Sequence, residues 1–313
     1  MFLLRIIENM KRNIYSKLWM IFFVLMGAAC TNQVEDAIPV SDQPIEFSVQ
    51  SDWKEIPNTR SNDGKTKFTT GDKIQIFGFH KSSSGEVQKF MYRVDDLNRG
   101  QIVNFDGKNW NYSPKRFWPK EGTLDFYAGY PQYSVLYDEK NHKMIYEQTV
   151  NPLQLDLLWG VSNNHDCTPT NRSSNVVITM KHALAKVIIR FDDSLGKIKQ
   201  AIVSAYRAGY FFPNETQGIP HWYVDTTSIQ NDTITPYYQD QTAIGDAPVF
   251  ILPDRITELK LIKDDEPEIN VSDKIKEYTF EAGKLYTLTI SKGVQKKNTN
   301  SRSIAMSVRC VSE

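Results

Sequence analysis

The stretch Val176–Phe191, VVITMKHALAKVIIRF, decides the fold. From residue 183 to residue 191 its apolar side chains occupy every second position, so one face of an extended strand would be apolar throughout. Leu184, Ile188 and Phe191 also match helical spacing, so periodicity alone leaves a helix open. The high content of β-branched residues favours the extended form. We therefore predict two strands in this stretch.

Similar short runs lie on both sides of this stretch. Between two of them, Asp106-Gly107 suits a tight hairpin that needs positive φ. No segment has a convincing amphipathic helical pattern. The predicted strands are 45–49, 73–79, 102–105, 109–112, 123–130, 156–160, 176–180, 183–191, 201–206, 249–252, 259–261, 278–280, 285–290 and 303–311. Short strands between turn-rich loops predict an all-β chain of β-sandwiches, with a domain break near residues 192–197.

Composition limits the class of partner. The chain has 313 residues, with 37 basic and 37 acidic side chains and 40% hydrophobic residues. Without residues 1–29 it keeps 33 basic and 36 acidic side chains, a net charge of −3. A nucleic-acid-binding protein needs a clustered basic excess, so no nucleic-acid partner is expected. The apolar content is sufficient for folded domains with cores.

The amino-terminal segment is predicted to be a signal peptide. Its apolar run, residues 18–26, follows basic residues. The run is too short to cross the roughly 30 Å hydrocarbon core of a bilayer as a helix, which takes about 20 residues. Met10 is the expected start of this signal, with Met1 as the alternative.

The segment Leu25-Met26-Gly27-Ala28-Ala29-Cys30 resembles a bacterial lipobox. Residues 1–29 would then be removed as a lipoprotein signal peptide, and Cys30 would carry acyl chains such as palmitate. Two or three acyl chains hold a protein stably on a membrane. An ordinary secreted protein with a chance cysteine, or an uncleaved anchor, stays open because Gly27 stands where leucine is commonest.

Two flexible regions flank the predicted sandwiches. Residues 30–44 are polar and contain proline, which is typical of a tether. After the first strand, a polar loop carries Arg60, where a trypsin-like protease could reach the chain. Residues 292–313 form a polar linker and a final strand with an apolar face. Such a strand can pair with its own sheet or with a neighbouring molecule, and both remain open.

The sequence shows no usual arrangement for catalysis or metal binding. The five histidines are scattered, and neither HExxH nor CxxC occurs. We therefore expect no metal, no cofactor and no enzymatic activity. His182, on a predicted strand, is interpreted as a hydrogen-bonded packing residue. Cys167 and Cys310 lie far apart in sequence and are either paired or free.

Several short blocks lie in order over most of the chain behind the lipobox-like segment. They are Phe68-x-x-Gly71-Asp72-x-Ile74, Phe117-Trp118-Pro119, Leu124-Asp125-Phe126-Tyr127-Ala128-x-Tyr130-Pro131, Lys181-His182-Ala183-Leu184-Ala185-Lys186, Leu252-Pro253 and Ala282-Gly283-Lys284-Leu285-Tyr286. In their order and spacing these blocks together resemble the fimbrillin family of Bacteroidetes, which includes the anchor and stalk proteins of type V pili.

The resemblance implies two transthyretin-like β-sandwich domains, residues 45–192 and 193–291, and polymerisation by strand exchange. In stalk subunits of the family an arginine-specific protease removes the first strand, and a strand of another subunit fills the groove. Carried over to this chain, Arg60 is the cleavage site. The exchanged strands are marked by Ile45, Phe47 and Val49, which are removed, and by Ile304, Met306 and Val308, which are donated.

The predicted function is that of a structural component of a cell-surface fimbria, or pilus, with adhesion as the outcome. The expected location is the outer membrane, the cell surface or the fimbrium. Expected partners are other fimbrial subunits, the outer membrane through the lipid, and surface ligands of a host or of bacteria. Family anchor subunits keep their lipid, and the ending Val308-Arg309-Cys310-Val311 departs from that of a stalk subunit. The roles of subunit, tip and anchor therefore all stay open.

The alternative function is that of a carbohydrate-binding surface lipoprotein. Tryptophan rings can stack on the faces of sugars, although in β-sandwiches they mostly fill cores. The tryptophans concerned are Trp53, Trp110, Trp118, Trp159 and Trp222.

Overall fold

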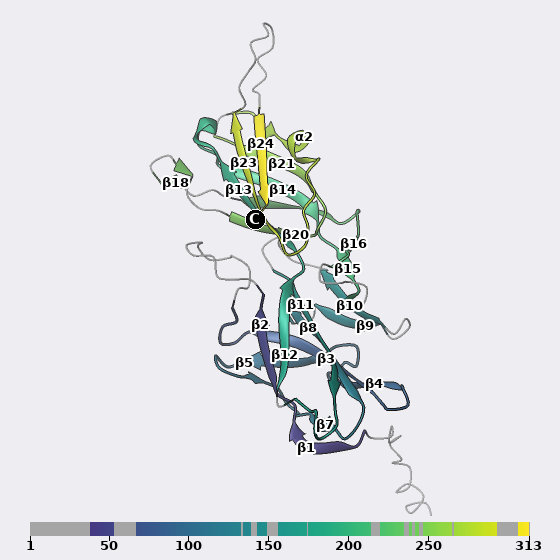
Figure 1. Cartoon of the computed structure of the whole chain (residues 1–313). Coiled ribbons are helices and arrows are strands. Elements are labelled where there is room, and N and C mark those ends of the chain that lie inside the picture. The colour runs from purple at the N-terminus through teal and green to yellow at the C-terminus, as the bar shows by residue number, and fades with distance from the viewer. Residues whose placement is uncertain are drawn as a thin grey trace, which may run out of the picture. The chain divides into compact units, whose positions relative to one another are not determined.

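A computed structural model of the chain describes residues 38–52, 67–132, 134–138, 143–148, 156–173, 175–213, 220–234, 238–239, 242–243, 247–264, 266–292 and 306–312. In these residues strands dominate and the helices are short (Figure 1). The predicted all-β class is therefore confirmed. The compact unit Ser41–Glu313 holds every strand except the first residue of β1 (Val40–Pro44).

The largest sheet has eight strands, which come from the first 182 residues. Its order is β2-β12-β11-β8-β3-β5-β6, with β4 paired to β3. The strands are β2 (Phe47–Ser51), β3 (Lys73–Lys81), β4 (Val87–Met91), β5 (Gln101–Phe105), β6 (Trp110–Asn111), β8 (Thr123–Tyr130), β11 (Leu158–Asp166) and β12 (Val176–His182). β2 lies at one edge of this sheet, where β12 is its neighbour.

The middle of the large sheet is formed by β3 and β8, which pair antiparallel. Every residue of β3 between its two ends is buried, so both faces of that strand are covered. β5 and β6 form the predicted hairpin, and Gly107 in its turn has a φ of +100°. Glycine adopts this left-handed conformation without steric cost, as the Asp-Gly pair predicts.

Two four-stranded sheets pack face to face in the second half of the chain. One has the order β20-β13-β23-β24 and the other β17-β14-β21-β22. Alternate residues of both, such as Val187, Val203, Leu259 and Leu288, share one buried cluster, as in a β-sandwich. The elements are β13 (Ala185–Phe191), η1 (Asp193–Leu195), β14 (Gln200–Tyr206), β17 (Ile229–Ile234), β20 (Ala247–Ile251), β21 (Ile256–Ile262), β22 (Ile269–Asn270), α2 (Ser272–Ile275), β23 (Leu285–Lys292) and β24 (Met306–Ser312).

A further four-stranded sheet has the order β16-β15-β10-β9. Its inner side chains join residues of β3, β8 and β20 in a second buried cluster. Tyr146 and Phe211 stack in this cluster with ring centroids 5.1 Å apart, and the indole of Trp222 donates to the Ala183 carbonyl at 2.8 Å. The strands are β9 (Val135–Asp138), β10 (Lys143–Gln148), β15 (Gly209–Phe211) and β16 (Tyr223–Val224). β1 pairs with β7 (Phe117–Pro119), and β18 (Tyr238–Gln239) pairs with β19 (Thr242–Ala243).

The stretch that decides the fold is divided between two sheets. β12 belongs to the large sheet, whereas β13 pairs parallel with β23 and antiparallel with β20. The boundary predicted between residues 192 and 193 therefore separates β13 from its sheet partners. This pairing favours a division between β12 and β13, and the organisation in two domains stays a prediction.

The strand predicted at 278–280 is wrong. These residues follow α2 as an irregular segment. The Phe280 amide donates to the Asp254 carbonyl at 2.7 Å, and the ring is buried in the sandwich cluster. The apolar residues are therefore buried without forming a strand.

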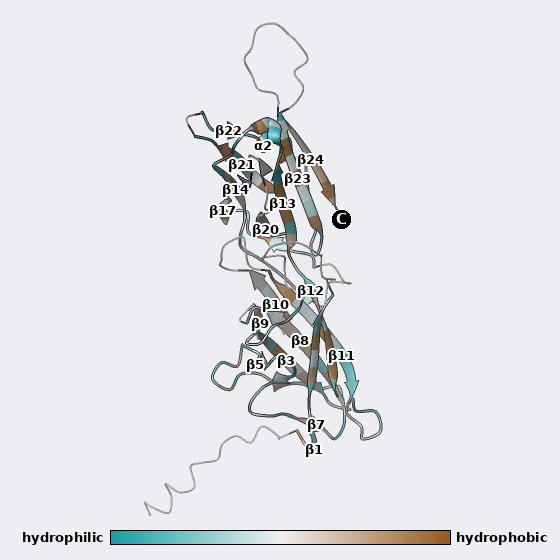
Figure 2. Ribbon diagram, turned by 90° about the vertical axis from the view of Figure 1, so that its left-hand side faces the viewer, coloured by the Kyte–Doolittle hydropathy of each residue, from teal (hydrophilic) through white to brown (hydrophobic). Residues whose placement is uncertain are grey.

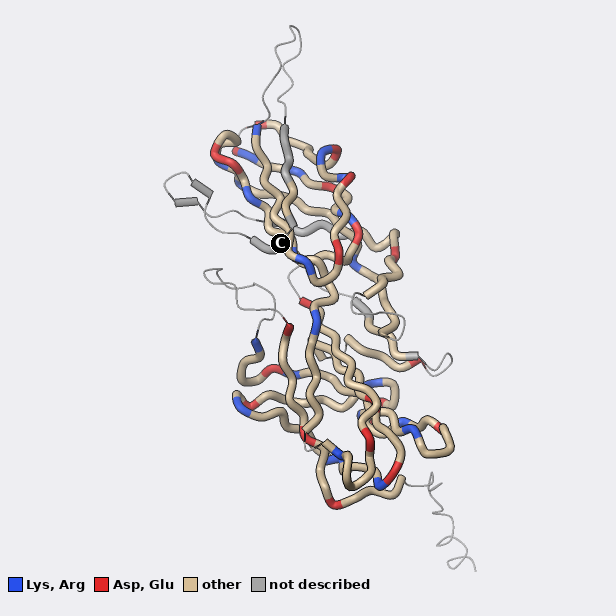
Figure 3. Tube along the Cα trace, viewed as in Figure 1, with Lys and Arg blue, Asp and Glu red and all other residues tan. Residues whose placement is uncertain are grey.

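Charge and hydropathy follow the expected pattern on the described residues. Lys and Arg are interspersed with Asp and Glu along the chain (Figure 3). The apolar colour follows strands such as β13, whereas α2 and the end of β11 are hydrophilic (Figure 2). No helix among the residues described above combines the length and the apolar character that a bilayer span requires.

Candidate functional site

The first strand of the large sheet is the candidate functional element. Ile45, Phe47 and Val49 are buried, with 0%, 5% and 9% of their surfaces exposed, as their alternation predicts. β2 runs parallel to β12 in a register from Phe47 opposite Val176 to Ser51 opposite Met180. β2 thus buries two apolar side chains, Phe47 and Val49, and Ile45 is buried just before it, while β2 pairs with one strand. Whether it is exchanged remains a prediction.

Aromatic rings form the floor under β2. The ring of Phe47 meets that of Phe126 edge-on, with centroids 5.3 Å apart and an interplanar angle of 87°. It meets Tyr112 at 5.7 Å and 59°. Aromatic pairs prefer such tilted arrangements and gain about 0.5–1.5 kcal/mol beyond area burial. Phe47 is therefore the main apolar anchor of the strand.

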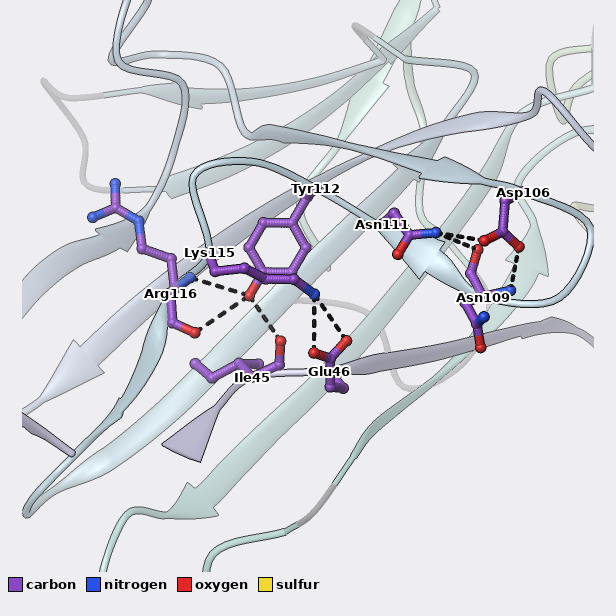
Figure 4. A network of polar contacts seen from close by, with 8 residues as sticks. All are labelled: Ile45, Glu46, Asp106, Asn109, Asn111, Tyr112, Lys115 and Arg116. Carbon is purple, nitrogen blue, oxygen red and sulfur yellow. Dashed lines mark hydrogen bonds and ion pairs between the residues drawn. The ribbon is translucent and has the colours of Figure 1, made fainter. Parts of the chain in front are cut away.

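The amino end of the first strand is held by the segment that follows the β5–β6 hairpin (Figure 4). The Tyr112 hydroxyl donates to the Ile45 carbonyl at 2.8 Å, and the Ile45 amide donates to the Arg116 carbonyl at 2.9 Å. Burial raises the pKa of Tyr112 to about 12, so its hydroxyl keeps its proton at neutral pH. We call Tyr112, Lys115 and Arg116 the strand seat.

An ion pair lies on the outer side of the strand seat. Lys115 Nζ contacts both carboxylate oxygens of Glu46, at 2.9 and 3.0 Å (Figure 4). The same ammonium lies 4.7 Å from the centroid of the Tyr112 ring. Glu46 stands between buried Ile45 and buried Phe47, so its side chain points away from the core. The seat therefore combines apolar, backbone and charge contacts.

The hairpin turn before the seat is fixed by its own polar contacts. Asp106 accepts from the Asn109 amide at 2.6 Å and from the Asn111 side chain at 2.8 Å (Figure 4). It also accepts from the Lys108 amide at 2.8 Å. These hydrogen bonds, the one from Asn109 first, lower the pKa of Asp106. The turn thereby constrains the segment that carries the seat.

The carboxyl end of the first strand meets a buried histidine. His182 Nδ1 lies 2.8 Å from Asp156 Oδ2, and both side chains are nearly inaccessible. On the other side of the ring, Nε2 lies 3.4 Å from Ser51 Oγ and 4.0 Å from Asp52 Oδ1. Burial raises the pKa of Asp52, while the charge of His182 opposes that shift. The Asp52 amide also donates to the Met180 carbonyl at 2.9 Å. Together these contacts of Ser51, Asp52, Asp156 and His182 form a clamp at the carboxyl end of the strand.

The serine, histidine and aspartate of this clamp occur in the same combination as in hydrolases. A nucleophile also needs an accessible substrate cleft and oxyanion donors. Here the imidazole is fully buried between strand ends. His182 is therefore a buried packing residue with a hydrogen bond to Ser51, as the sequence predicts.

The final strand pairs with its own sheet. β24 runs antiparallel to β23, from Tyr286 opposite Ser312 to Lys292 opposite Met306, and it lies at the sheet edge. Of the predicted donor residues, Met306 and Val308 lie in β24, and Ile304 lies outside the described residues. Cys30 and Arg60 also lie outside them.

The four tryptophans of this set that the structure describes do not form a sugar-stacking surface. Trp110, Trp118, Trp159 and Trp222 are buried, with between 0% and 8% of their surfaces exposed. Their rings fill cores, so these four side chains are not accessible for stacking on a sugar. Trp53 lies outside the described residues.

Sequence reasoning missed an exposed aromatic face on β15 and β16. Tyr210 and Tyr223 stack with ring centroids 5.2 Å apart, and each is 42% exposed. Phe212 and His221 lie 5.7 and 5.3 Å from the Tyr223 ring. Aromatic residues stand two positions apart at 210 and 212 and at 221 and 223. This spacing places them on one face of an extended strand and could have indicated the aromatic face.

The described residues contain no group of three His, Cys, Asp or Glu side chains placed to hold a metal ion. Cys167 is a buried free thiol and Cys310 a half-buried one. Burial, with a contribution from Asp166, raises the pKa of Cys167 to about 12.

Comparison with known proteins shows relatives of the same fold. The sequence model of the fimbrillin-like family matches residues 59–305. A "putative cell adhesion protein" from Bacteroides uniformis is 16% identical, with a TM-score of 0.53 over 87% of this chain and 98% of that chain. Another, from Bacteroides ovatus, is 14% identical, with a TM-score of 0.53 over 86% of this chain and 95% of that chain. No curated protein matches the sequence.

Proposed function

Because the chain belongs to the fimbrillin-like family, we propose that it is a structural component of a cell-surface fimbria, as subunit, tip or anchor. Its work is assembly and adhesion rather than turnover of a substrate. Its partners are other fimbrial subunits. The two sandwich domains are proposed to be of the transthyretin-like type that the family resemblance implies.

Export follows the lipoprotein route in this proposal. The lipobox-like segment supports removal of residues 1–29 and acylation of Cys30. The protein then sits in the outer membrane and faces the cell surface. An anchor would keep this lipid, whereas a stalk subunit would lose it with the first strand.

Assembly occurs by strand exchange after cleavage at Arg60. The observation that carries this proposal is the position of β2 at the edge of the large sheet, where Phe47, Val49 and, just before the strand, Ile45 are buried. Its removal would leave β12 with an unpaired edge above an apolar floor. Such an edge is a template for a strand of another molecule.

The donated strand contains Ile304, Met306 and Val308. β24 pairs with one strand, β23, at the edge of its sheet. It can therefore leave without breaking any other strand pair. This position supports a donor role. It equally suits a molecule in which β24 stays paired with β23 of its own chain.

Analysis of the form found at the cell surface tests this function. We expect radiolabelled palmitate in the natural chain and none in Cys30→Ser. We also expect fibres with a chain that begins at Ser61, absent in Arg60→Ala. Intact monomer that begins at Cys30 would restrict the protein to an anchor. Absence of both label and fibre association would refute the proposal.

Carbohydrate binding is a second candidate function, favoured by the aromatic face on which Tyr210, His221 and Tyr223 are exposed and Phe212 is half-buried. Aromatic side chains at a surface combine apolar ring area with polar groups at the rim. Native gels that contain polysaccharide test it. Replacement of both tyrosines by alanine should abolish any retardation, and Phe117→Ala, at another exposed ring, should preserve it.

A further inference from the structure

The strand seat carries a positive charge that the first strand neutralises. Lys115 Nζ lies 2.9 and 3.0 Å from the two oxygens of Glu46. It also lies 4.7 Å from the centroid of the Tyr112 ring, a contact that does not involve the first strand. Lys115 therefore stays at the rim of the groove when the strand leaves, and the carboxylate leaves with the strand.

The position of this charge is specific in the strand register. Ile45 and Phe47 point into the core on either side of Glu46, and the Glu46 carbonyl accepts from the Val176 amide at 2.8 Å. A strand that fills the same groove must place two apolar residues as Ile45 and Phe47 are placed. The residue between them then faces Lys115.

We propose that Lys115 makes the groove selective for an incoming strand with a carboxylate between its first two buried apolar residues. This inference rests on the proposed strand exchange. It names the partner by chemistry, as a strand of alternating apolar residues with an acidic residue at the second position.

The final strand of this chain does not have that pattern. Between Ile304, Met306, Val308 and Cys310 stand Ala305, Ser307 and Arg309. None of them supplies a carboxylate. Ala305 faces Lys115 if Ile304 and Met306 take the places of Ile45 and Phe47, and Arg309 would bring a like charge there if Val308 and Cys310 take them. The partner is therefore a strand of a different polypeptide rather than a second copy of this chain.

The strength of the preference for a carboxylate depends on how exposed the Lys115–Glu46 ion pair is to solvent. Lys115 and Glu46 side chains are 36% and 44% exposed, so the interaction is partly screened by solvent. Exposed ion pairs change equilibria by roughly threefold, and replacement by a like charge should change them by about tenfold at low ionic strength.

A displacement assay on the full chain tests the inference. A site for a specific protease replaces residues 58–62, so the result does not depend on Arg60 as the natural cleavage site. After cleavage, release of the labelled amino-terminal fragment is followed by fluorescence anisotropy. The competitors are peptides of residues 41–52 with glutamate, glutamine or lysine at position 46, and a peptide of residues 303–312.

The expected order of competition is glutamate, then glutamine roughly threefold weaker, then lysine about tenfold weaker, with 303–312 no better than glutamine. Lys115→Glu should reverse this order and Lys115→Ala should remove it. Lys108→Ala, at a lysine in the turn of the same hairpin whose amide donates to Asp106, should leave the order unchanged. Release without a charge preference, or the same order in Lys115→Glu, would overturn the selectivity alone. No release by any peptide would refute strand exchange, and the selectivity with it.

Discussion

Replacement of Phe47 by alanine should weaken the attachment of the first strand selectively. The ring is 5% exposed and packs against Phe126 and Tyr112 at 5.3 and 5.7 Å. Truncation of a buried phenylalanine costs about 3–5 kcal/mol, which includes the two aromatic pairs at about 0.5–1.5 kcal/mol each. Since every 1.4 kcal/mol is tenfold, opening of β2 should become about a hundredfold to several thousandfold more frequent.

Hydrogen exchange with mass spectrometry measures how often β2 opens, and urea unfolding measures the free energy of unfolding. The amides of Val176 and Asp52 bond across the β2–β12 pair, so their exchange should rise most, while β13–β23 amides change little. Val177→Ala, on the exposed face of β12, is the matched control and should cost at most about 0.5 kcal/mol. A cost of Phe47→Ala below about 1 kcal/mol would refute the burial argument. An equal rise of exchange in every sheet would refute a separable first strand.

Three further predictions concern buried polar groups. Because burial raises its pKa to about 12, Cys167 should resist maleimide at pH 8 and react after denaturation; equal labelling in both states would contradict this. Stability should fall between pH 10 and pH 12, because tyrosine ionises near pH 10 when unfolded while Tyr112 stays neutral until about 12. Tyr112→Phe should reduce that fall in denaturation midpoints, and an unchanged slope would exclude this origin. His182→Ala should cost roughly 1–3 kcal/mol, because it removes a fully buried polar side chain that lies 2.8 Å from Asp156. Additive effects of His182→Ala and Asp156→Ala in urea unfolding would count against this coupling.

Local patterns gave the strands because side-chain alternation and turn chemistry are short-range properties. β8 has the bounds predicted for a strand at residues 123–130. Gly107 has the positive φ that an Asp-Gly hairpin needs. The apolar face of Ile45, Phe47 and Val49 is buried for the same reason. In each case the signal lies within a few neighbouring residues.

Contacts between distant segments were not accessible in this way. Tyr112 lies 67 residues from Ile45 in sequence, and nothing near either residue indicates their hydrogen bond. The place of β13 in a different sheet from β12 also depends on distant strands, because its partners lie 58 to 66 residues away in β20 and 99 residues away in β23. Phe280 is buried like a strand residue, yet a hydrogen bond to Asp254 places it in an irregular segment.

The parallel pairing of β2 with β12 has a mechanical consequence. In a lipidated chain that keeps its amino-terminal strands, traction from the membrane passes β1, which pairs with β7, before it reaches the amino end of β2. Such a pull runs along the strand, so the β2–β12 hydrogen bonds from Phe47 to Ser51 are loaded in shear and must fail together. An anchor of this design withstands drag on the fibre better than one that unzips bond by bond.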